Sequence, residues 1–167
     1  INGKDGSKAM KTETRKVDKK IIEREIEEMK LKNMTIESLE KAADELNVMA
    51  DRIVELIPDI EFDNPMQGGK DLLVLLAPVD EFYQFLKSVE VLFGLDLSDI
   101  QAGEDSKTLA DLGADMSGHL DCLLKAFESS DQVTVCDLLE YEIAVGLKKY
   151  AEVVPLLVEI VKNKKVA

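Results

Sequence analysis

Apolar residues recur at spacings of three and four along most of this chain, which is the period of a helix that buries one face. In the first clear run they fall at Leu39, Ala43, Leu46, Ala50, Ile53 and Ile57. Thr35 precedes this run and suits an N-cap, and Pro58 follows it and suits a helix end. The pattern predicts a helix over residues 35–57.

A second helix is predicted over residues 67–93, with the widest apolar stripe of the chain. Its seam is Leu72, Leu75, Val79, Phe82, Leu86, Val89 and Phe93. Because this register continues across Pro78, the proline predicts a kink rather than a break. Gly94 is a suitable residue just beyond the end of the helix.

Two further helices are predicted over residues 106–128 and 131–163. Their seams are Leu109, Leu112, Met116, Leu120, Leu123 and Phe127, and then Leu139, Ile143, Gly146, Tyr150, Val154, Leu157 and Val161. Pro155 predicts a kink or a division of the last helix. Leu95, Leu97 and Ile100, in the long connection before the third helix, are expected to close one end of the core.

The first 33 residues are polar and leave two interpretations open. Val17, Ile21, Ile22, Ile26 and Met29 fit one helical face, which favours a helix over residues 17–32. Residues 29–34 (MKLKNM) alternatively read as a short strand.

Together these patterns predict an all-α protein, an antiparallel up-and-down four-helix bundle with an N-terminal helical or partly extended appendage. Residues 1–33 form a polar, basic segment and residues 34–167 an acidic bundle domain. The predicted core includes Leu75, Val79, Phe82, Leu86, Leu120, Leu123, Leu139 and Ile143.

Charge is unevenly distributed along the chain. The net charge is −13, yet residues 1–33 hold ten Lys/Arg against seven Asp/Glu, a net of +3. The remainder holds eleven against twenty-seven, a net of −16. Such an acidic body repels phosphate backbones, so we expect no nucleic-acid partner.

Several protein classes are also disfavoured by composition. The longest apolar run, residues 72–79, is far shorter than a membrane span, so we expect no membrane association. With two cysteines and no signal-peptide pattern, we expect a cytoplasmic protein with free thiols. The chain opens on Ile1 rather than Met, which suggests either a trimmed chain or a piece of a longer protein.

The stretch HLDCLLKAFESSDQVTVCDLLE (119–140) contains the only histidine and both cysteines. By spacing alone, His119, Cys122, Cys136 and Glu140 resemble four zinc ligands on a helical hairpin. However, Cys122 lies about 140° from the centre of its apolar stripe and should face solvent. We therefore predict an ordinary hairpin without zinc.

A carboxylate site is the alternative for this region. Glu142 comes close to the buried stripe, whereas Glu140 lies about 90° from it. The two carboxylates, on either side of Tyr141, are a possible metal or ligand site. No hydrolase, phosphate-loop or dinucleotide-binding motif is present. We expect no catalytic residues and no cofactor.

Two stretches resemble known families. The sequence SSDQVTVCDLLEYEIAVGLKKY (129–150), with Asp131 and the run 137–142, resembles the helical hairpin of uncharacterised bacterial proteins that join a small N-terminal region to a bundle. This resemblance implies no activity. NVMADRIVELI (47–57) is loosely similar to PhoU-type helical bundles, but their metal-binding carboxylate motifs are not matched here.

These observations favour a non-enzymatic protein–protein interaction module that binds another protein or itself. Leu73, Val74, Tyr83 and Leu92 are apolar residues beyond those that one seam requires. They predict an exposed apolar patch and a homodimer. The alternative hypothesis is a helical bundle that binds a metal or small ligand through carboxylates.

Overall fold

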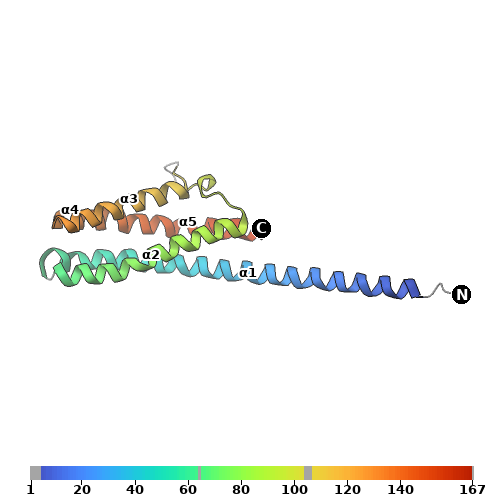
Figure 1. The fold of residues 1–167 in the computed structure, drawn as a ribbon. Coiled ribbons are helices and arrows are strands. Elements are labelled where there is room, and N and C mark those ends of the chain that lie inside the picture. The colour runs from blue at the N-terminus through green and yellow to red at the C-terminus, as the bar shows by residue number, and fades with distance from the viewer. Residues whose placement is uncertain (1–4, 64, 104–106, 167) are drawn as a thin grey trace.

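The helices run alternately up and down around one core, as Figure 1 shows for the computed structural model. The structure describes residues 5–63, 65–103 and 107–166, with side chains for 19–61, 68–103 and 107–166. The elements in order are α1 (Asp5–Pro58), a π-helical turn (Asp59–Asp63), α2 (Pro65–Phe93), a 3-10 turn (Leu97–Asp99), α3 (Leu109–Glu128), α4 (Gln132–Asp137), a π-helical segment (Leu138–Ile143) and α5 (Ala144–Asn163).

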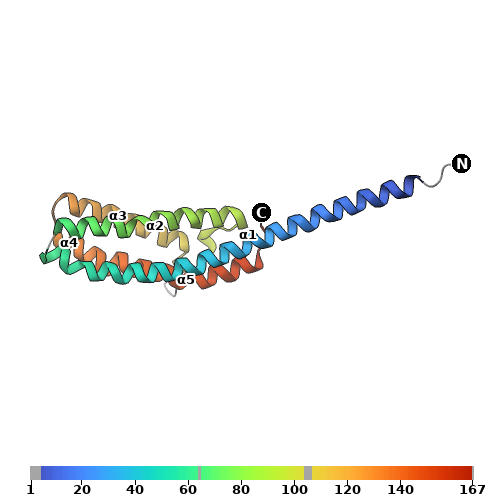
Figure 2. The same cartoon turned by 90° about the horizontal axis from the view of Figure 1, so that it is seen from below.

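The all-α expectation is confirmed. The chain turns back at each end of the bundle, so α1 and α3 run in one direction while α2 and the α4–α5 segment run in the other (Figures 1 and 2). Within the described ranges, extended pairing is limited to one isolated bridge between Gln101 and Thr108. This bridge lies in the connection between α2 and α3.

The first helix differs from the sequence prediction. α1 is continuous, so the predicted helix start at Thr35 and the alternative strand over residues 29–34 are both wrong. Thr35 is buried inside the helix, where its hydroxyl donates a hydrogen bond to the Leu31 carbonyl at 2.9 Å. A threonine that bonds the carbonyl four residues earlier needs no cap position, because its polar group is already paired.

Local side-chain hydrogen bonds fix where α3 and α4 begin. Thr108 accepts a hydrogen bond from the Asp111 amide while the Asp111 carboxylate accepts from the Thr108 amide, which forms a capping box. The predicted start at residue 106 lies outside the described residues. Asp131 caps α4 by accepting from the Thr134 amide. At the end of α2, Gly94 has φ +56°, a conformation that side chains other than glycine disfavour.

The last helical segment is divided, but not where the sequence suggested. The π-helical turn at Leu138–Ile143 interrupts it, whereas α5 continues through Pro155 to Asn163. The missing N–H of the proline therefore does not end this helix.

Six of the eight residues predicted for the core are buried. Val79, Phe82, Leu86, Leu123, Leu139 and Ile143 are buried as predicted. Leu75 and Leu120 are only half-buried, because each lines a cavity between neighbouring helices. Leu97 and Ile100 are buried and close one end of the core, with the half-buried Leu95 packed against them.

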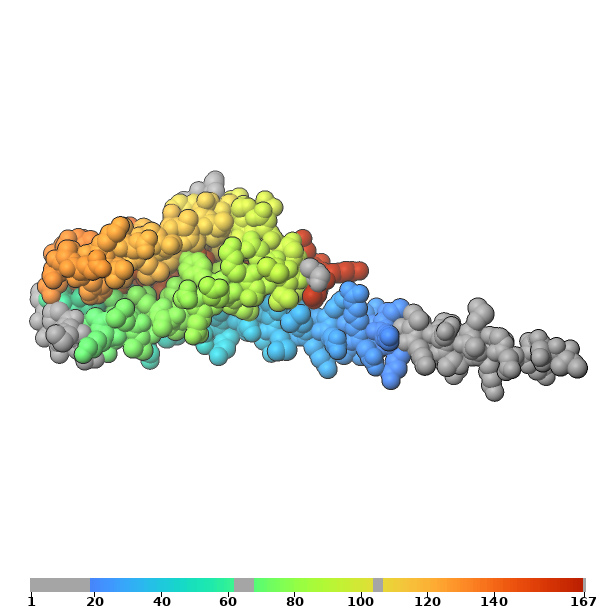
Figure 3. Space-filling view, in the orientation of Figure 1, coloured from blue at the N-terminus to red at the C-terminus, as the bar shows by residue number. Residues whose placement is uncertain are grey.

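α1 extends well beyond the bundle. At the boundary, the Lys32 ammonium donates a hydrogen bond to the Lys162 carbonyl at 3.0 Å, where α5 ends. The part of α1 before Lys32 projects from the body as a single helix (Figure 1). In the space-filling view, the blue portion of α1 likewise extends past the other helices (Figure 3). We call residues 19–31 of this projection, the part whose side chains are described, the arm.

Candidate binding groove between α1 and α2

A groove of about 1000 Å³ lies between α1 and α2. It is lined on α1 by residues between Lys41 and Leu56, and on α2 by residues between Asp71 and Glu81. Its volume exceeds that of a second cavity, which lies between α2 and α3. We call it the α1–α2 groove.

The groove has an apolar lining. Its apolar residues are Val48, Met49, Leu56, Val74, Leu75 and Pro78. Met49 belongs to the buried core, but Val48 is 55% exposed and Val74 is 76% exposed. The groove therefore presents aliphatic side chains to solvent, and covering them would be favourable.

Charged side chains complete the lining and most are acidic. The basic members are Lys41 and Arg52, and the acidic members are Asp44, Glu45, Glu55, Asp71 and Glu81. The formal net charge of the lining is thus −3. Lys41 is paired with Glu45 at 3.2 Å within α1, so part of its charge is already compensated. An occupant with basic flanks suits this lining better than an acidic one.

Helix packing explains why the groove opens on this side. α1 packs more extensively along α5 than along α2. Buried alanines such as Ala50 on α1 and Ala151 on α5 allow close approach of backbones. On the α2 wall, Pro78 has no N–H to donate to the Val74 carbonyl four residues earlier. That carbonyl thus lacks its usual helical donor beside the groove.

A smaller cavity of about 320 Å³ lies between α2 and α3. It is lined by Leu76, Val79, Asp80, Tyr83, Gly113, Ser117 and Leu120. Behind it, the hydroxyl groups of Tyr83 and Tyr150 form a hydrogen bond of 2.6 Å. The hydroxyl of Tyr83, which lines this cavity, is therefore already hydrogen-bonded.

Burial dominates the titration of these two tyrosines. It raises the pKa of Tyr83 to about 12, against a smaller lowering by the hydrogen bond with Tyr150. Burial, followed by the hydrogen bond with Tyr83, also raises the pKa of Tyr150 well above its ordinary value. Both hydroxyls are thus neutral donors and acceptors near neutral pH, not bases.

The structure separates the four residues that resembled zinc ligands by spacing. Cys122 is exposed on α3 and Cys136 is buried on α4, and both are free cysteines. Glu140 is exposed, whereas His119 is half-buried. As the helical geometry predicted, the exposed Cys122 faces away from the core.

His119 instead lies near a carboxylate outside that set. Its Nε2 atom is 3.3 Å from Oε2 of Glu142, which lies in the π-helical segment Leu138–Ile143. Glu142 was expected close to the buried stripe, but its side chain is about half exposed. Among the residues with described positions, no three His, Cys, Asp or Glu side chains gather closely enough to hold a metal ion. The metal or ligand site at Glu140 and Glu142 therefore stays a prediction.

The groove itself was not predicted from the sequence, and of the four residues expected to form an exposed apolar patch only Val74 lines it. Val74 was predicted to be an exposed apolar residue outside the α2 seam. It is highly exposed, as is Leu73 beside it. Tyr83 and Leu92 are half-buried instead. Val48 on α1 was not singled out. It is also an apolar residue outside the seam of its helix, and this is the sequence signal that identifies it.

No helix in the described part of the chain combines the length and apolarity needed to cross a membrane. Comparison of the chain with models of protein families, with curated proteins and with solved structures finds no match. The two sequence resemblances therefore stay predictions.

Proposed function

We propose that this protein is a non-enzymatic protein–protein interaction module and that the α1–α2 groove is its binding face. The observation that carries the proposal is the pair of exposed aliphatic walls, Val48 on α1 and Val74 on α2, beside the half-buried Leu75. An apolar groove between two helices with charged edges is the shape that receives an amphipathic helix. Such a helix inserts its apolar side chains while its polar face stays in water.

The groove fits a polypeptide better than a small ligand. It is open to solvent rather than enclosed. A small molecule needs a concave site that covers most of its surface. The alternative, metal or ligand binding at Glu140 and Glu142, has no comparable supporting observation.

Site-specific photocrosslinking tests this proposal. A photoreactive p-benzoylphenylalanine at Val74 of the full chain should form adducts with a protein in native host cells. Val133 is a matched control, since it is 70% exposed on α4, outside the groove. Adducts at Val74 should be lost when Val48→Asp is added.

Adducts that are equal at the two positions, or that survive Val48→Asp, would contradict the proposal. Circular dichroism of each variant confirms that the bundle is folded. Val48 and Val74 are both exposed, so their substitution should leave the core intact.

A further inference from the structure

The arm carries an apolar stripe that is separate from the buried seam of α1. Ile22, Ile26 and Met29 are spaced by four and three residues, so they share one face of the helix. At about 100° per residue, this face lies roughly 120° from the seam that α1 buries around Leu39 and Leu46. The stripe is therefore a second apolar face, which the core of its own bundle does not use.

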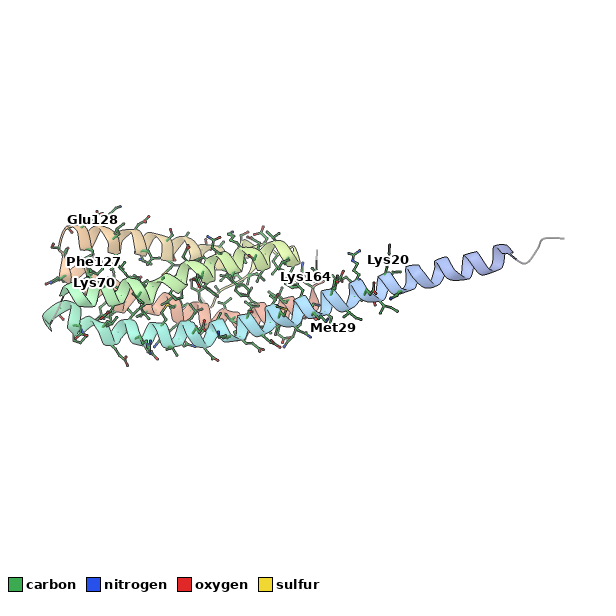
Figure 4. The ribbon with its side chains drawn as sticks, turned by 60° about the horizontal axis from the view of Figure 1, so that its bottom comes forward. Lys20, Met29, Lys70, Phe127, Glu128 and Lys164 are labelled. Carbon is green, nitrogen blue, oxygen red and sulfur yellow. The ribbon has the colours of Figure 1, made fainter. Side chains whose placement is uncertain are left out.

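Solvent reaches all three stripe residues. Ile22 is 55% exposed, Ile26 is 46% exposed and Met29 is 62% exposed. Figure 4 places Met29 beyond the end of the bundle marked by Lys164, with Lys20 on the opposite side of α1. Because helical segments without tertiary packing are marginal in water, a partner that covers the stripe would stabilise the arm.

Opposite charges flank the stripe along both of its edges. At about 100° per residue, Glu25 and Lys32 lie on one edge, while Glu23 and Lys30 lie on the other. On each edge the acidic residue comes seven residues before the basic one. When two such helices lie antiparallel, each acidic residue faces a basic residue of the second helix. The stripe is thus complementary in charge to a second copy of itself.

We infer that the arms of two copies pack antiparallel along this stripe, which makes the protein a homodimer. In this register Ile22 faces Asn33 of the second copy, and Ile26 faces Met29 of the second copy. The same contact is made twice, so the assembly closes at two copies. It uses the arm and not the α1–α2 groove, so the inference can fail while the proposed function stands.

The charge of the whole chain favours the antiparallel direction over the parallel one. The chain after residue 33 carries a net charge of −16, so a parallel pair would hold two strongly acidic bundles at the same end. An antiparallel pair holds them at opposite ends. It also directs residues 1–33 of each copy, with a net charge of +3, towards the acidic bundle of the other copy.

Sedimentation equilibrium of the full chain tests the association. The wild-type protein should be a dimer at several hundred micromolar, and Ile22→Asp/Ile26→Asp should raise the dimer Kd at least about tenfold. Leu124→Asp on α3 and Val74→Asp in the groove are the controls, because both residues are exposed and lie outside the arm. Neither control should change the Kd, and circular dichroism confirms that each variant is folded.

Disulfide crosslinking tests the direction and the register. Ile22→Cys and Asn33→Cys, each made with Cys122→Ser, should form no intermolecular disulfide when oxidised separately, because neither position faces its own copy. An equimolar mixture of the two variants should form one, since antiparallel arms bring these positions together. Ile21→Cys mixed with Asn33→Cys is the control, because Ile21 lies about 100° from Ile22 on the helix and should crosslink far less.

Charge exchange identifies the contact between the edges. Glu23→Lys and Lys30→Glu should each weaken the dimer, because each places like charges opposite one another. The two substitutions in one chain should restore association. Loss of folding cannot produce such a restoration, and the effect of each single substitution should shrink at high salt.

Three outcomes would overturn the inference. The first is a monomer at several hundred micromolar. The second is a disulfide-linked dimer of the Ile22→Cys variant alone, which would mean that the arms are parallel. The third is a dimer that the arm substitutions leave unchanged, which would mean that another surface associates. In each case, groove-dependent crosslinking to a different protein would still support the proposed function.

Discussion

The Tyr83 and Tyr150 hydroxyl oxygens lie 2.6 Å apart and join α2 to α5 inside the bundle. Their rings meet edge to face, with centroids 5.6 Å apart and an interplanar angle of 86°. Phe82 completes the cluster against Tyr150, with ring centroids 5.7 Å apart. The pair is a polar contact between two helices whose buried side chains are mostly aliphatic.

Tyr150→Phe should therefore destabilise the protein by about 1–2 kcal/mol, because the Tyr83 hydroxyl is left without its partner. The double substitution Tyr83→Phe/Tyr150→Phe should cost less than the sum of the single ones, since it removes both polar groups. Urea unfolding of the four proteins measures this coupling. Strict additivity would mean that the hydrogen bond contributes nothing.

The free energy of unfolding should also decrease at alkaline pH, because burial keeps both tyrosines neutral in the folded protein. Both tyrosines have a folded pKa raised above the ordinary value, so their contribution is complete below about pH 10. It is lost as the pH rises from there through the raised pKa of about 12 for Tyr83. The double phenylalanine variant should lose less stability across this range. Equal losses, measured by denaturation between pH 9 and 12, would argue against the assignment.

Two helical glycines should respond to alanine in opposite directions. A Cβ at Gly68 would lie 2.8 Å from Ile60 Cγ1 and 3.1 Å from the Ile60 amide nitrogen, so Gly68→Ala should cost about 1–3 kcal/mol. A Cβ at Gly118 meets nothing within 4 Å. Gly118→Ala should therefore stabilise the protein by about 0.5–1 kcal/mol. Thermal unfolding decides the sign of each.

Phe82→Ala should cost about 3–5 kcal/mol, because it leaves a cavity where a buried ring packed. Leu73→Ala in the same helix is the control. Leu73 is 70% exposed, so its truncation should change the free energy of unfolding by less than about 0.5 kcal/mol. Similar losses at the two positions would show that the register of α2 is wrong.

The two cysteines should differ in reactivity towards a thiol reagent. Cys122 is exposed and should react rapidly in the native protein. Burial raises the pKa of the Cys136 thiol, and neighbouring acidic residues raise it further, so Cys136 should react slowly. Two thiols should titrate after denaturation. Equal native rates would mean that α4 opens readily.

Hydrophobic periodicity predicted the helices well, because each seam must face the same core. It could not place the start of a helix as reliably, since Thr35 bonds the Leu31 carbonyl within α1 as readily as a threonine caps a helix. The capping box of α3 was missed, although its sequence signal is present. Thr108 and Asp111 stand three apart just before an apolar run, which is the pattern of a capping box.

The groove was harder to predict, because it depends on distances between helices. Leu75 and Leu120 belong to unbroken seams, yet they are half-buried where α1, α2 and α3 diverge. Periodicity gives the direction of a side chain but not the spacing of the neighbouring helix. The exposed Val48 and Val74 are apolar by sequence, but only the arrangement of α1 and α2 places them in one groove.

α1 has a mechanical consequence. From Ser7 to Ile57 it contains neither glycine nor proline, and its 54 residues extend about 80 Å. It is therefore one continuous helix that packs in the bundle only through its C-terminal part. The hydrogen bond between Lys32 and Lys162 lies at the boundary of the packed part. About 40 Å of helix lies outside, so a tilt of about 5° inside the bundle would move the free end by about 3.5 Å. Occupancy of the α1–α2 groove, where α1 is one wall, would be converted into displacement at the far tip.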